Sequence, residues 1–480
     1  MSLPFDEVKY NSLMSRLEAV EVRLSNVKQE STMRLDSQFY EKIYDKISSY
    51  ISKYNTTTLK SLSNWITQGP NPVFSDNAEI PCLTGRNIAG GRVNYHNADY
   101  INEAEYNELS KYQLKIGDTL ITLKGRGSIG KIGYVTEVKK AIFSRNIGLI
   151  RPNEKINSAY INAYIMSKYG QILISRGETG GTGQATLTTS YINSIPVPLF
   201  KNLENSIAEV LINSERILKE STFIYTAAQS LLLSELGLAG YTPTKENVSV
   251  KSFADSFGSS GRLDAEYYQP KYEEVEEKIK SYKNGFKNFR SACNLYDDNF
   301  TPNDNADYKY IELSNIGSHG DITNVAFQLG KELPTRARRK ITAGQVIISS
   351  IEGSLESCAL VIDEYDNALC STGFYVINSD LINSETLLIL FKLFPIQSML
   401  KQRCSGTILT AINKEELLSI PIPIIADDVQ EKIASMVKEI YATRKKSAEL
   451  LDYAKQALEI AIEQGENVAV KWLEEKGVQQ

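Results

Sequence analysis

The stretch Ser194-Ile195-Pro196-Val197-Pro198 recurs later in the chain as Ser419-Ile420-Pro421-Ile422-Pro423. Proline lacks a backbone N–H and restricts the residue before it to extended conformations, so neither stretch can continue a helix or occupy a central strand. A long run with helical apolar spacing follows each one. We therefore expect two extended connectors, each leading from a mixed domain into a long helix.

Further matching stretches occur in the same order in both halves, which indicates an internal repeat. The landmarks of the first half are Arg34-Leu35-Asp36, Asn87-Ile88, Gly117 and Gly181-Thr182, and their counterparts are Arg262-Leu263-Asp264, Asn315-Ile316, Gly344 and Gly406-Thr407. Short β-rich runs alternate with helical patches in each half. Strands are predicted at 119–123, 142–150, 346–350 and 374–377.

This organisation predicts an α+β fold with two tandem mixed α/β domains joined by two long antiparallel coiled-coil helices, in an internal pseudo-two-fold repeat. The predicted segments are an N-terminal heptad helix at 1–32, a first mixed domain at 33–200, a first long helix at 201–238, a linker at 239–260, a second mixed domain at 261–424, a second long helix at 425–466 and a C-terminal tail at 467–480. The N-terminal segment is expected to serve as a third strut helix or as an interaction tail.

Apolar residues in both long helices recur alternately three and four positions apart, which is the spacing of a coiled-coil seam. At 1.5 Å per residue each helix would extend roughly 50 Å, enough for a two-helix strut. The alternative is that each helix folds back onto its own mixed domain. The predicted seam consists of Ile207, Val210, Leu211, Ile217, Leu218, Ile224 and Leu231 in the first helix, and of Ile433, Met436, Ile440, Leu450, Leu451 and Leu458 in the second.

Length and composition indicate a modular globular protein. The 480 residues suit two to four domains, and 42% hydrophobic with 23% charged residues excludes a wholly disordered or fibrous chain. No apolar run is long enough for a membrane span, so a cytoplasmic location is expected. The 5 cysteines are odd in number and never form a Cys-x-x-Cys pair, so neither a disulfide framework nor a zinc site is predicted.

Charge is distributed unevenly behind a formal net charge of −5. Residues 111–176 hold 12 Lys and Arg against 3 Asp and Glu, whereas residues 261–424 hold 17 against 22. The second half nevertheless contains the basic run Arg336, Arg338, Arg339 and Lys340. Clustered positive charge is typical of nucleic-acid binding, although a solvated surface is the other interpretation.

One string in the basic region imitates nucleotide-binding motifs. The residues Gly125-Arg126-Gly127-Ser128-Ile129-Gly130-Lys131-Ile132 satisfy GxGxxG and most of a P-loop. A P-loop needs Ser or Thr where Ile132 stands, and both motifs need a following helix, whereas the next residues favour a strand. We interpret the string as a basic loop between two strands, and predict no catalytic or metal-ligating residue.

The second half contains Ser405-Gly406-Thr407, then Ile412-Asn413-Lys414-Glu415-Glu416-Leu417, the proline stretch at 419–423, and a long helix. This series resembles the specificity subunits of type I restriction-modification systems. Weaker copies occur at Gly181-Thr182 and at 191–198, and the resemblance covers about residues 33–466. The Arg-Leu-Asp openings also resemble recognition subunits of type IIB-like enzymes.

The resemblance implies a non-catalytic DNA-recognition subunit of a restriction-modification complex. Two target-recognition domains, at 33–200 and 261–424, would each read one half of a bipartite double-stranded DNA target. The helices at 201–238 and 425–466 would set the spacing and dock two methyltransferase subunits. Whether a restriction nuclease or translocase subunit also belongs to the complex stays open. S-adenosylmethionine, with ATP and magnesium in some systems, would be bound by partner chains.

Two other classes of function stay open. One is a two-lobed protein-interaction scaffold, which the net acidic charge favours; the other is a DNA methyltransferase or nuclease in its own right, for which the motifs are missing. Under the leading hypothesis the expected DNA contacts are Lys124, Arg126, Lys131, Arg145, Arg176, Thr182 and Gln184 in the first domain, and Arg336, Arg338, Arg339, Lys340 and Thr407 in the second.

Overall fold

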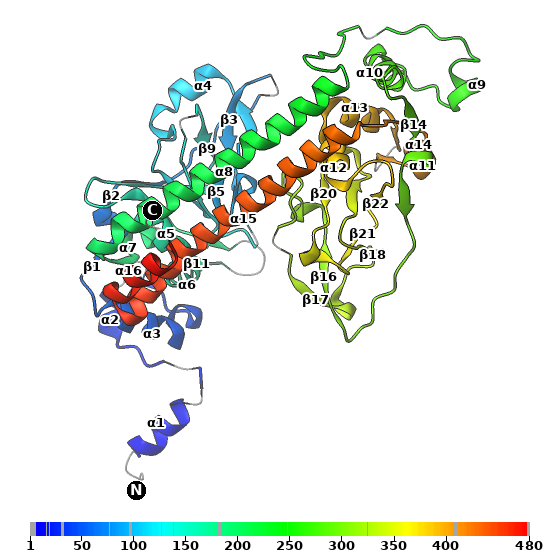
Figure 1. Ribbon diagram of the computed structural model, residues 1–480. Coiled ribbons are helices and arrows are strands. Elements are labelled where there is room, and N and C mark those ends of the chain that lie inside the picture. Colours follow the sequence, from blue (N-terminus) through cyan, green and yellow to red (C-terminus); the bar gives the residue numbers. More distant parts are fainter. Residues whose placement is uncertain are drawn as a thin grey trace. The chain divides into compact units, whose positions relative to one another are not determined.

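The computed structural model describes residues 6–15, 17–18, 20–29, 33–75, 77–95, 98–125, 127–137, 139–180, 185–246, 248–323, 325–406 and 410–477. The chain divides into two compact units. Unit 1 comprises Met1–Ile217 with Lys446–Gln480, and unit 2 comprises Leu218–Lys445. The two long helices, α8 (Lys201–Glu235) and α15 (Asp427–Gln464), therefore each contribute one half to each unit (Figure 1).

Unit 1 is built on a six-stranded sheet with the strand order β2-β10-β7-β8-β5-β4 and a smaller sheet β6-β3-β9. Its strands are β1 (Thr56–Thr58), β2 (Ser63–Gln68), β3 (Ile80–Leu83), β4 (Ile88–Ala89), β5 (Gly91–Val93), β6 (Asp99–Ile101), β7 (Thr119–Thr122), β8 (Ile132–Tyr134), β9 (Ile142–Phe143), β10 (Ile147–Pro152), β11 (Glu178–Thr179), β12 (Thr186–Leu187) and β13 (Pro196–Pro198). Its helices besides α8 and α15 are α1 (Glu7–Ser15), α2 (Leu24–Gln29), α3 (Lys42–Ile51), α4 (Glu103–Glu108), α5 (Ser158–Met166), α6 (Lys168–Arg176), α7 (Thr189–Ser194) and α16 (Glu466–Glu475), with 3-10 turns η1 (Ser37–Tyr40), η2 (Leu59–Leu62), η3 (Gly85–Asn87) and η4 (Ser110–Tyr112).

The proline stretch of unit 1 is extended, as its sequence predicts. It forms β13, which pairs only with β1 among the described strands, so the missing proline N–H groups cost no bonds in a central sheet. Two buried tyrosines of α5 secure it: the Tyr160 hydroxyl donates to the carbonyl of Pro198 at 2.7 Å, and the Tyr164 hydroxyl to that of Pro196 at 2.6 Å. These two hydrogen bonds fix the connector immediately before α8 begins.

Unit 2 contains the sheets β15-β22-β19-β20 and β17-β16-β21-β18. Its strands are β14 (Phe286–Asn288), β15 (Asn294–Tyr296), β16 (Asp307–Ile311), β17 (Phe327–Leu329), β18 (Ala337–Lys340), β19 (Val346–Ser349), β20 (Cys358–Leu360), β21 (Leu369–Ser371), β22 (Phe374–Asn378), β23 (Cys404–Ser405), β24 (Ala411–Ile412) and β25 (Pro421–Pro423). Its helices besides α8 and α15 are α9 (Phe257–Ser260), α10 (Pro270–Lys280), α11 (Phe289–Ala292), α12 (Ser384–Lys392), α13 (Phe394–Gln402) and α14 (Lys414–Ser419), with 3-10 turns η5 (Leu313–Asn315), η6 (Gly330–Glu332), η7 (Glu352–Ser354) and η8 (Asp363–Tyr365).

The topology of the two units confirms the repeat. The antiparallel trio β10-β7-β8 of unit 1 corresponds to β22-β19-β20 of unit 2, and the parallel pair β3 with β9 corresponds to β16 with β21. The hairpin of β11 and β12 likewise corresponds to that of β23 and β24. In both units the proline strand closes the mixed domain immediately before the long helix.

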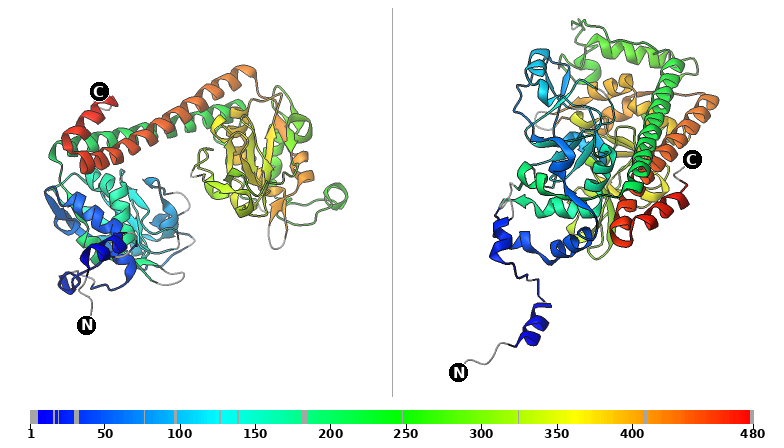
Figure 2. Two further views of the ribbon diagram at one scale, coloured as in Figure 1. Left: turned by 90° about the horizontal axis from the view of Figure 1, so that it is seen from below. Right: turned by 90° about the vertical axis from the view of Figure 1, so that its left-hand side faces the viewer.

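Helices α8 and α15 lie side by side and antiparallel within each unit (Figures 1 and 2). One buried cluster in unit 1 joins Ile207, Val210, Leu211 and Ile217 of α8 to Leu450, Leu451 and Leu458 of α15. In unit 2 the later half of α8 and the earlier half of α15 share a second cluster, with Ile433 and Ile440 buried and Ile224, Leu231 and Met436 partly buried. Leu218 is only partly buried. Both clusters also contain sheet and helix residues of the mixed domains, so each helix half packs on its partner helix and on a domain at once.

Three boundaries predicted from the sequence need correction. The N-terminal segment forms α1 and α2 rather than one heptad helix: among its described heptad residues Val27 is buried, but Leu13, Leu17 and Leu24 are more than half exposed, so no continuous apolar seam stabilises a single helix. The C-terminal residues are not a tail: α16 packs Ala469 and Leu473 into the unit 1 core, and the Glu466 carboxylate accepts from the Asn202 amide at 2.6 Å.

The third correction concerns the run 142–150, which is split into β9 and β10 by a turn at Ser144–Asn146. The amide of Ser144 donates to the carbonyl of Leu83, which holds β9 in the smaller sheet, while β10 enters the larger one. The predicted linker at 239–260 also carries the short helix α9 near its end.

Candidate nucleic-acid interface

The loops of unit 1 gather at one end of its main sheet. Strand β7 is antiparallel to both β8 and β10, so the end of β7 lies beside the beginnings of its two neighbours. We call this the loop end of unit 1. Lys124 and Lys131 bound the loop that leaves β7 there, and Arg145 lies in the turn before β10; all three side chains are exposed.

Hydrogen bonds hold these segments against one another. The amide of Leu123 donates to the carbonyl of Asn146 at 2.8 Å, and Gln68 donates from its side chain to the carbonyl of Arg145 at 2.6 Å. The structure thus brings together three of the residues predicted to contact DNA. Arg126, also predicted, lies outside the described residues.

The glycine string of this loop has a conformational explanation. Gly125, Gly127 and Gly130 adopt φ values of 118°, 69° and 76°, in the region that residues with a Cβ rarely enter. The next element is the strand β8, not a helix. The glycines therefore permit the turn between two strands, and the GxGxxG spacing needs no phosphate to account for it.

A hairpin lies beside the basic loop. Lys124 forms a β-bridge with Thr186 of β12, and the amide of Leu187 donates to the carbonyl of Leu123 at 2.9 Å. The hairpin connection at 181–184, with the predicted contacts Thr182 and Gln184, lies outside the described residues. The strands on either side of that connection, β11 and β12, lie at the loop end, because Thr186 of β12 pairs with Lys124.

The repeated Arg-Leu-Asp sequence braces this hairpin in each unit. In unit 1 the Arg34 guanidinium binds the Asp36 carboxylate through two contacts of 2.7 Å and donates to the carbonyl of Arg176 at 3.1 Å, just before β11. The Tyr40 hydroxyl donates to the Arg34 carbonyl at 2.8 Å. The Arg34 pair lowers the pKa of Asp36, which keeps this carboxylate charged.

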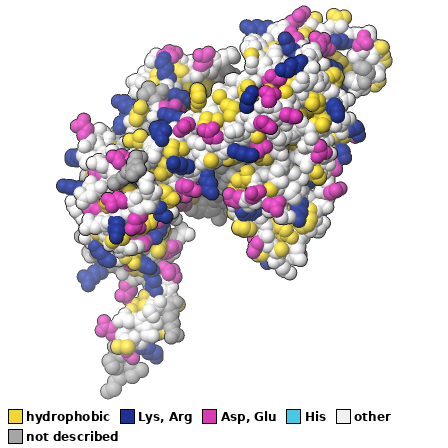
Figure 3. All heavy atoms as spheres, in the orientation of Figure 1, with side chains coloured by type: hydrophobic (Ala, Val, Ile, Leu, Met, Phe, Trp, Pro, Cys, Tyr) yellow, Lys and Arg dark blue, Asp and Glu magenta, His cyan; other side chains and the backbone are white. Residues whose placement is uncertain are grey.

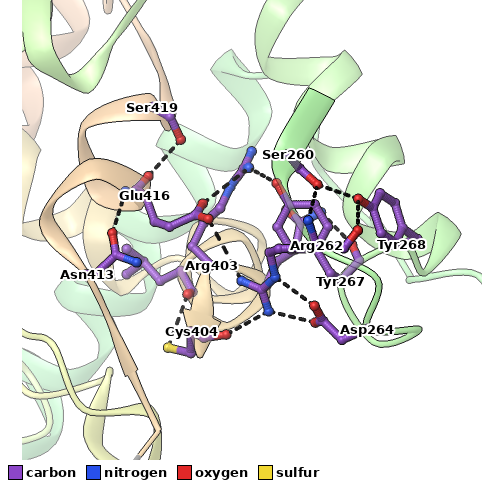
Figure 4. A network of polar contacts seen from close by, with 12 residues as sticks. Ser260, Arg262, Asp264, Tyr267, Tyr268, Arg403, Cys404, Asn413, Glu416 and Ser419 are labelled. Carbon is purple, nitrogen blue, oxygen red and sulfur yellow. Dashed lines mark hydrogen bonds and ion pairs between the residues drawn. The ribbon is translucent and has the colours of Figure 1, made fainter. Parts of the chain in front are cut away.

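Unit 2 repeats the brace (Figure 4). Arg262 binds the Asp264 carboxylate at 2.8 and 2.6 Å and donates to the carbonyl of Cys404 at 3.0 Å, at the start of the hairpin of β23 and β24 (Figure 4). Arg403 lies beside it and contacts Glu416 at 3.7 Å. Sequence comparison identified the motif as a repeat marker, and only the structure assigns it this role.

Arg176, one of the predicted DNA contacts, takes part in the brace of unit 1. Its Nε donates to the carbonyl of Phe39 at 3.0 Å, and its guanidinium lies 4.1 Å from the centre of the Phe39 ring. This half-buried side chain therefore packs against the brace, and its contact with DNA stays a prediction.

The loop end of unit 2 has different chemistry. The amide of Ser350, after β19, donates to the carbonyl of Gly373 at 2.9 Å, which matches the Leu123 contact of unit 1. The residue that matches Lys124 is Ile351, which forms a β-bridge with Ala411 as Lys124 does with Thr186, and the next residue is Glu352, whose amide donates to the Thr410 carbonyl at 3.0 Å. Thr407 lies outside the described residues.

The basic run of unit 2 lies on and beside the neighbouring strand β18. Arg336 stands nearest the loop end, because its carbonyl accepts from the Thr372 amide at 2.8 Å, and it pairs with Glu312 at 3.3 Å. Arg338 donates to the Thr335 carbonyl at 3.0 Å, and Arg339 to the Asn299 side chain at 3.2 Å. The Lys340 ammonium lies 5.8 Å from the centre of the Phe300 ring. These partners hold the basic groups in an ordered row along one strand.

Sequence reasoning missed Arg86. This residue lies in η3, and the segment belongs to the loop end because an ideal Cβ on Gly85 would lie 2.9 Å from Thr122 Cγ2. The Arg86 side chain is 56% exposed and forms an ion pair with Asp99. No local motif marks it, since its neighbours at the loop end come from distant segments.

Other surfaces are less promising. On the face shown in Figure 3, Lys and Arg side chains are interspersed with Asp and Glu over both long helices. Among the described residues, no group of three or more His, Cys, Asp or Glu is placed to hold a metal ion, and no helix is long and apolar enough to cross a membrane.

The duplication seen in the fold is matched by a duplicated family signature. The family model for the type I restriction modification DNA specificity domain matches residues 73–221 and again residues 288–452. The chain belongs to this family. The family is a DNA-binding specificity module of restriction-modification systems and is non-catalytic, and both matched segments run from a mixed domain into a long helix.

Solved structures of specificity subunits are similar to this specificity-domain chain at low identity. The type I restriction-modification S subunit from M. genitalium is 12% identical, with 88% of this chain and 96% of that chain covered and a TM-score of 0.36. The HsdS subunit from Thermoanaerobacter tengcongensis is 13% identical, with 86% and 97% covered and a TM-score of 0.28. No curated protein matches the chain.

Proposed function

We propose that the chain is the DNA-recognition subunit of a type I restriction-modification complex, in which each repeat reads one half of a bipartite target. The observation that carries this proposal is the duplicated specificity domain, each copy with its loops gathered at the same end of an equivalent sheet. Two such ends on one chain suit a DNA target with two separated halves.

The two units contribute unequally to DNA affinity. The loop end of unit 1 exposes Lys124, Lys131 and Arg145. In unit 2 the matching loop carries Glu352, and the basic groups are on β18 and already hydrogen bonded. Exposed lysines bind phosphate in any sequence context, whereas an ordered row of arginines suits base edges. Unit 1 thus supplies more of the salt-dependent affinity.

The methyltransferase subunits of such a complex would dock on the long helices. Phe223 of α8 is 77% exposed in unit 2, and Ile212 of the same helix is 63% exposed in unit 1, although most apolar residues of α8 face the seam. Exposed apolar side chains on a packed helix commonly mark a partner surface. Two methyltransferase subunits would bring S-adenosylmethionine. In a complex that also contains a nuclease or translocase subunit, that chain would bind ATP and magnesium.

The test is a salt titration of DNA affinity for the chain assembled with its methyltransferase. Neutralising Lys124, Lys131 and Arg145 together should flatten the logarithmic salt slope by about 2 to 3 units, at roughly 0.9 per phosphate contact. Lys155→Ala, an exposed lysine after β10, serves as the matched control and should leave the slope unchanged. An unaltered slope in the triple variant would remove the loop end from the interface.

A second experiment tests the division between halves. Arg339→Ala should weaken the cognate site by about 1 to 3 kcal/mol and relax the sequence in one half only. Sequencing of modified bases in cells that carry the variant reports both halves at once. Equal relaxation of the two halves contradicts the assignment of one repeat to each.

A further inference from the structure

A turn of each unit packs against that unit's own halves of α8 and α15. Turn 1 comprises residues 88–94 and turn 2 comprises residues 316–323. Turn 1 is closed by the amide of Asn94, which donates to the carbonyl of Asn87 at 2.8 Å. Turn 2 is closed by the amide of Thr323, which donates to the carbonyl of Asn315 at 2.8 Å.

The equivalent position in these turns carries opposite charges. Two residues before the closing amide stands Arg92 in turn 1 and Asp321 in turn 2. The residue before each is a glycine in a left-handed conformation, with φ of 79° at Gly91 and 84° at Gly320. The same backbone thus presents a guanidinium in one unit and a carboxylate in the other.

Arg92 is bound by both long helices within unit 1. Its Nε donates to Glu215 Oε1 at 2.9 Å, and its Nη2 donates to Ser214 Oγ at 2.8 Å and Ser447 Oγ at 2.7 Å. The two serines are fully buried, and each hydroxyl donates to the other's carbonyl at 2.7 Å. One charge therefore secures the turn to α8 and α15 together.

Asp321 is bound by α15 within unit 2. Arg444 Nη2 donates to Asp321 Oδ2 at 3.2 Å, and its Nη1 lies 3.2 Å from His319 Nδ1. The Tyr441 hydroxyl donates to the carbonyl of Gly320 at 2.8 Å. The two ion pairs are matched in burial, with the turn residue and the helix residue exposed by 22% and 15% in unit 1 and by 15% and 22% in unit 2.

The backbone of each turn lies close to neighbouring side chains at its glycine. An ideal Cβ on Gly91 would lie 2.5 Å from Met166 Sδ and 3.2 Å from Leu451 Cδ2. An ideal Cβ on Gly320 would lie 2.6 Å from Leu388 Cδ1. A turn carrying the wrong charge cannot withdraw its side chain by moving away without losing this packing.

We propose that the two ion pairs form a docking code that sets the position of each recognition domain on the helix that follows it, through Arg92 with Glu215 of α8 and Asp321 with Arg444 of α15. The chain itself keeps each domain at its own half, since two residues separate β13 from α8 and three separate β25 from α15. Within that half, reversing one charge of a pair would leave a partly buried charge facing its like, and repulsion of this kind disfavours that position of the domain. The inference goes beyond DNA recognition, because it concerns how each domain is held on the helices.

Hydrogen exchange of the full chain tests the code without DNA. Arg92→Glu should accelerate amide exchange in residues 88–94 about tenfold or more and leave residues 316–323 unchanged. Arg92→Glu with Glu215→Arg restores opposite charges and should return exchange to within about threefold of the parent chain. Lys155→Glu, the same charge change at an exposed site, should leave both turns unchanged.

The mirror experiment uses unit 2. Asp321→Arg should accelerate exchange in residues 316–323 alone, and adding Arg444→Glu should restore it. Rescue in both units supports the code, because loss of packing would not be repaired by a second substitution. If either double variant is no better protected than its single variants, or if one reversal opens both turns equally, the code is overturned.

Discussion

The ion pair between Asp118 and Arg151 offers the sharpest stability prediction for unit 1. Arg151 Nε and Nη2 bind the two carboxylate oxygens of Asp118 at 2.7 Å each, and the amide of Lys115 donates to Asp118 Oδ2 at 2.7 Å. The side chains are 1% and 17% exposed. A bidentate pair this deeply placed is costly to break from one side, because the remaining guanidinium loses its carboxylate and keeps only uncharged partners such as the Gln113 carbonyl.

Unit 2 contains a neutral version of the same turn. Gln345 follows Gly344 as Asp118 follows Gly117, and its Oε1 accepts from the amide of Thr342 at 2.8 Å. The strand position matching Arg151 is Asn378, since Ile377 pairs with Val346 as Ile150 pairs with Thr119. Unit 2 thus carries a neutral pair, Gln345 and Asn378, at the positions of Asp118 and Arg151.

Asp118→Gln should keep the turn's hydrogen bond and leave Arg151 without a carboxylate partner, at a cost of about 3 kcal/mol in the free energy of unfolding. For a unit of this size that cost corresponds to a fall in Tm of roughly 6–12 °C. Asp118→Gln with Arg151→Asn recreates the arrangement of unit 2 and should recover all but about 1 kcal/mol.

The measurement is thermal and urea unfolding of the full chain, with Lys155→Ala as an exposed control. If Asp118→Gln stays within about 1 kcal/mol of the parent chain, the pair does not stabilise unit 1 as its burial suggests. If the double variant is no more stable than the single one, the equivalence of the two turns is wrong.

Further predictions concern other parts of the chain. Leu473→Asp, in α16, places a carboxylate at a fully buried position and should lower the free energy of unfolding by about 3 kcal/mol or more, measured in urea. Leu451→Asp should similarly loosen the helix seam; unchanged Tm and unchanged methyltransferase binding would refute the assignment. The Arg262 hydrogen bond lowers the pKa of Asp264, so its stabilising effect is present above the ordinary value of 3.8 and lost as pH falls. The stability difference between the parent chain and Asp264→Asn, followed by acid titration, should therefore close below that pH. The five cysteines are buried, and burial raises the pKa of Cys82 and Cys293 to about 12, so a thiol reagent at pH 8 should titrate them only after denaturant is added.

Local periodicity explains what the sequence could predict. The seam followed from apolar spacing, and most of its residues, such as Ile207 and Leu458, are buried as that spacing requires. The strands β7 and β19 followed from short β-rich runs, and the proline connectors followed from the lack of an N–H. Each of these signals is contained within a few neighbouring residues.

Contacts between distant segments explain what the sequence could not predict. Arg92, Ser214 and Ser447 meet only in the folded unit, and each alone resembles an ordinary surface or helix residue. The sequence could not show that the Arg176 guanidinium lies against the Phe39 ring. The ten residues of α16 are too short for a persuasive periodic pattern, and their burial depends on Tyr453 and the rest of the unit 1 core.

The division of α15 between the units bears on the order in which the chain folds as it is synthesised. Unit 2 is one continuous segment, Leu218–Lys445, whereas unit 1 needs Lys446–Gln480 as well as its first 217 residues. A ribosome delivers those last residues after unit 2 is complete. Folding of the unit begun first therefore finishes last, against the usual N-terminal order. Until then the apolar face of α8 around Ile207 and Leu211 stays without the α15 residues that cover it, which makes the nascent N-terminal half a natural client for chaperones.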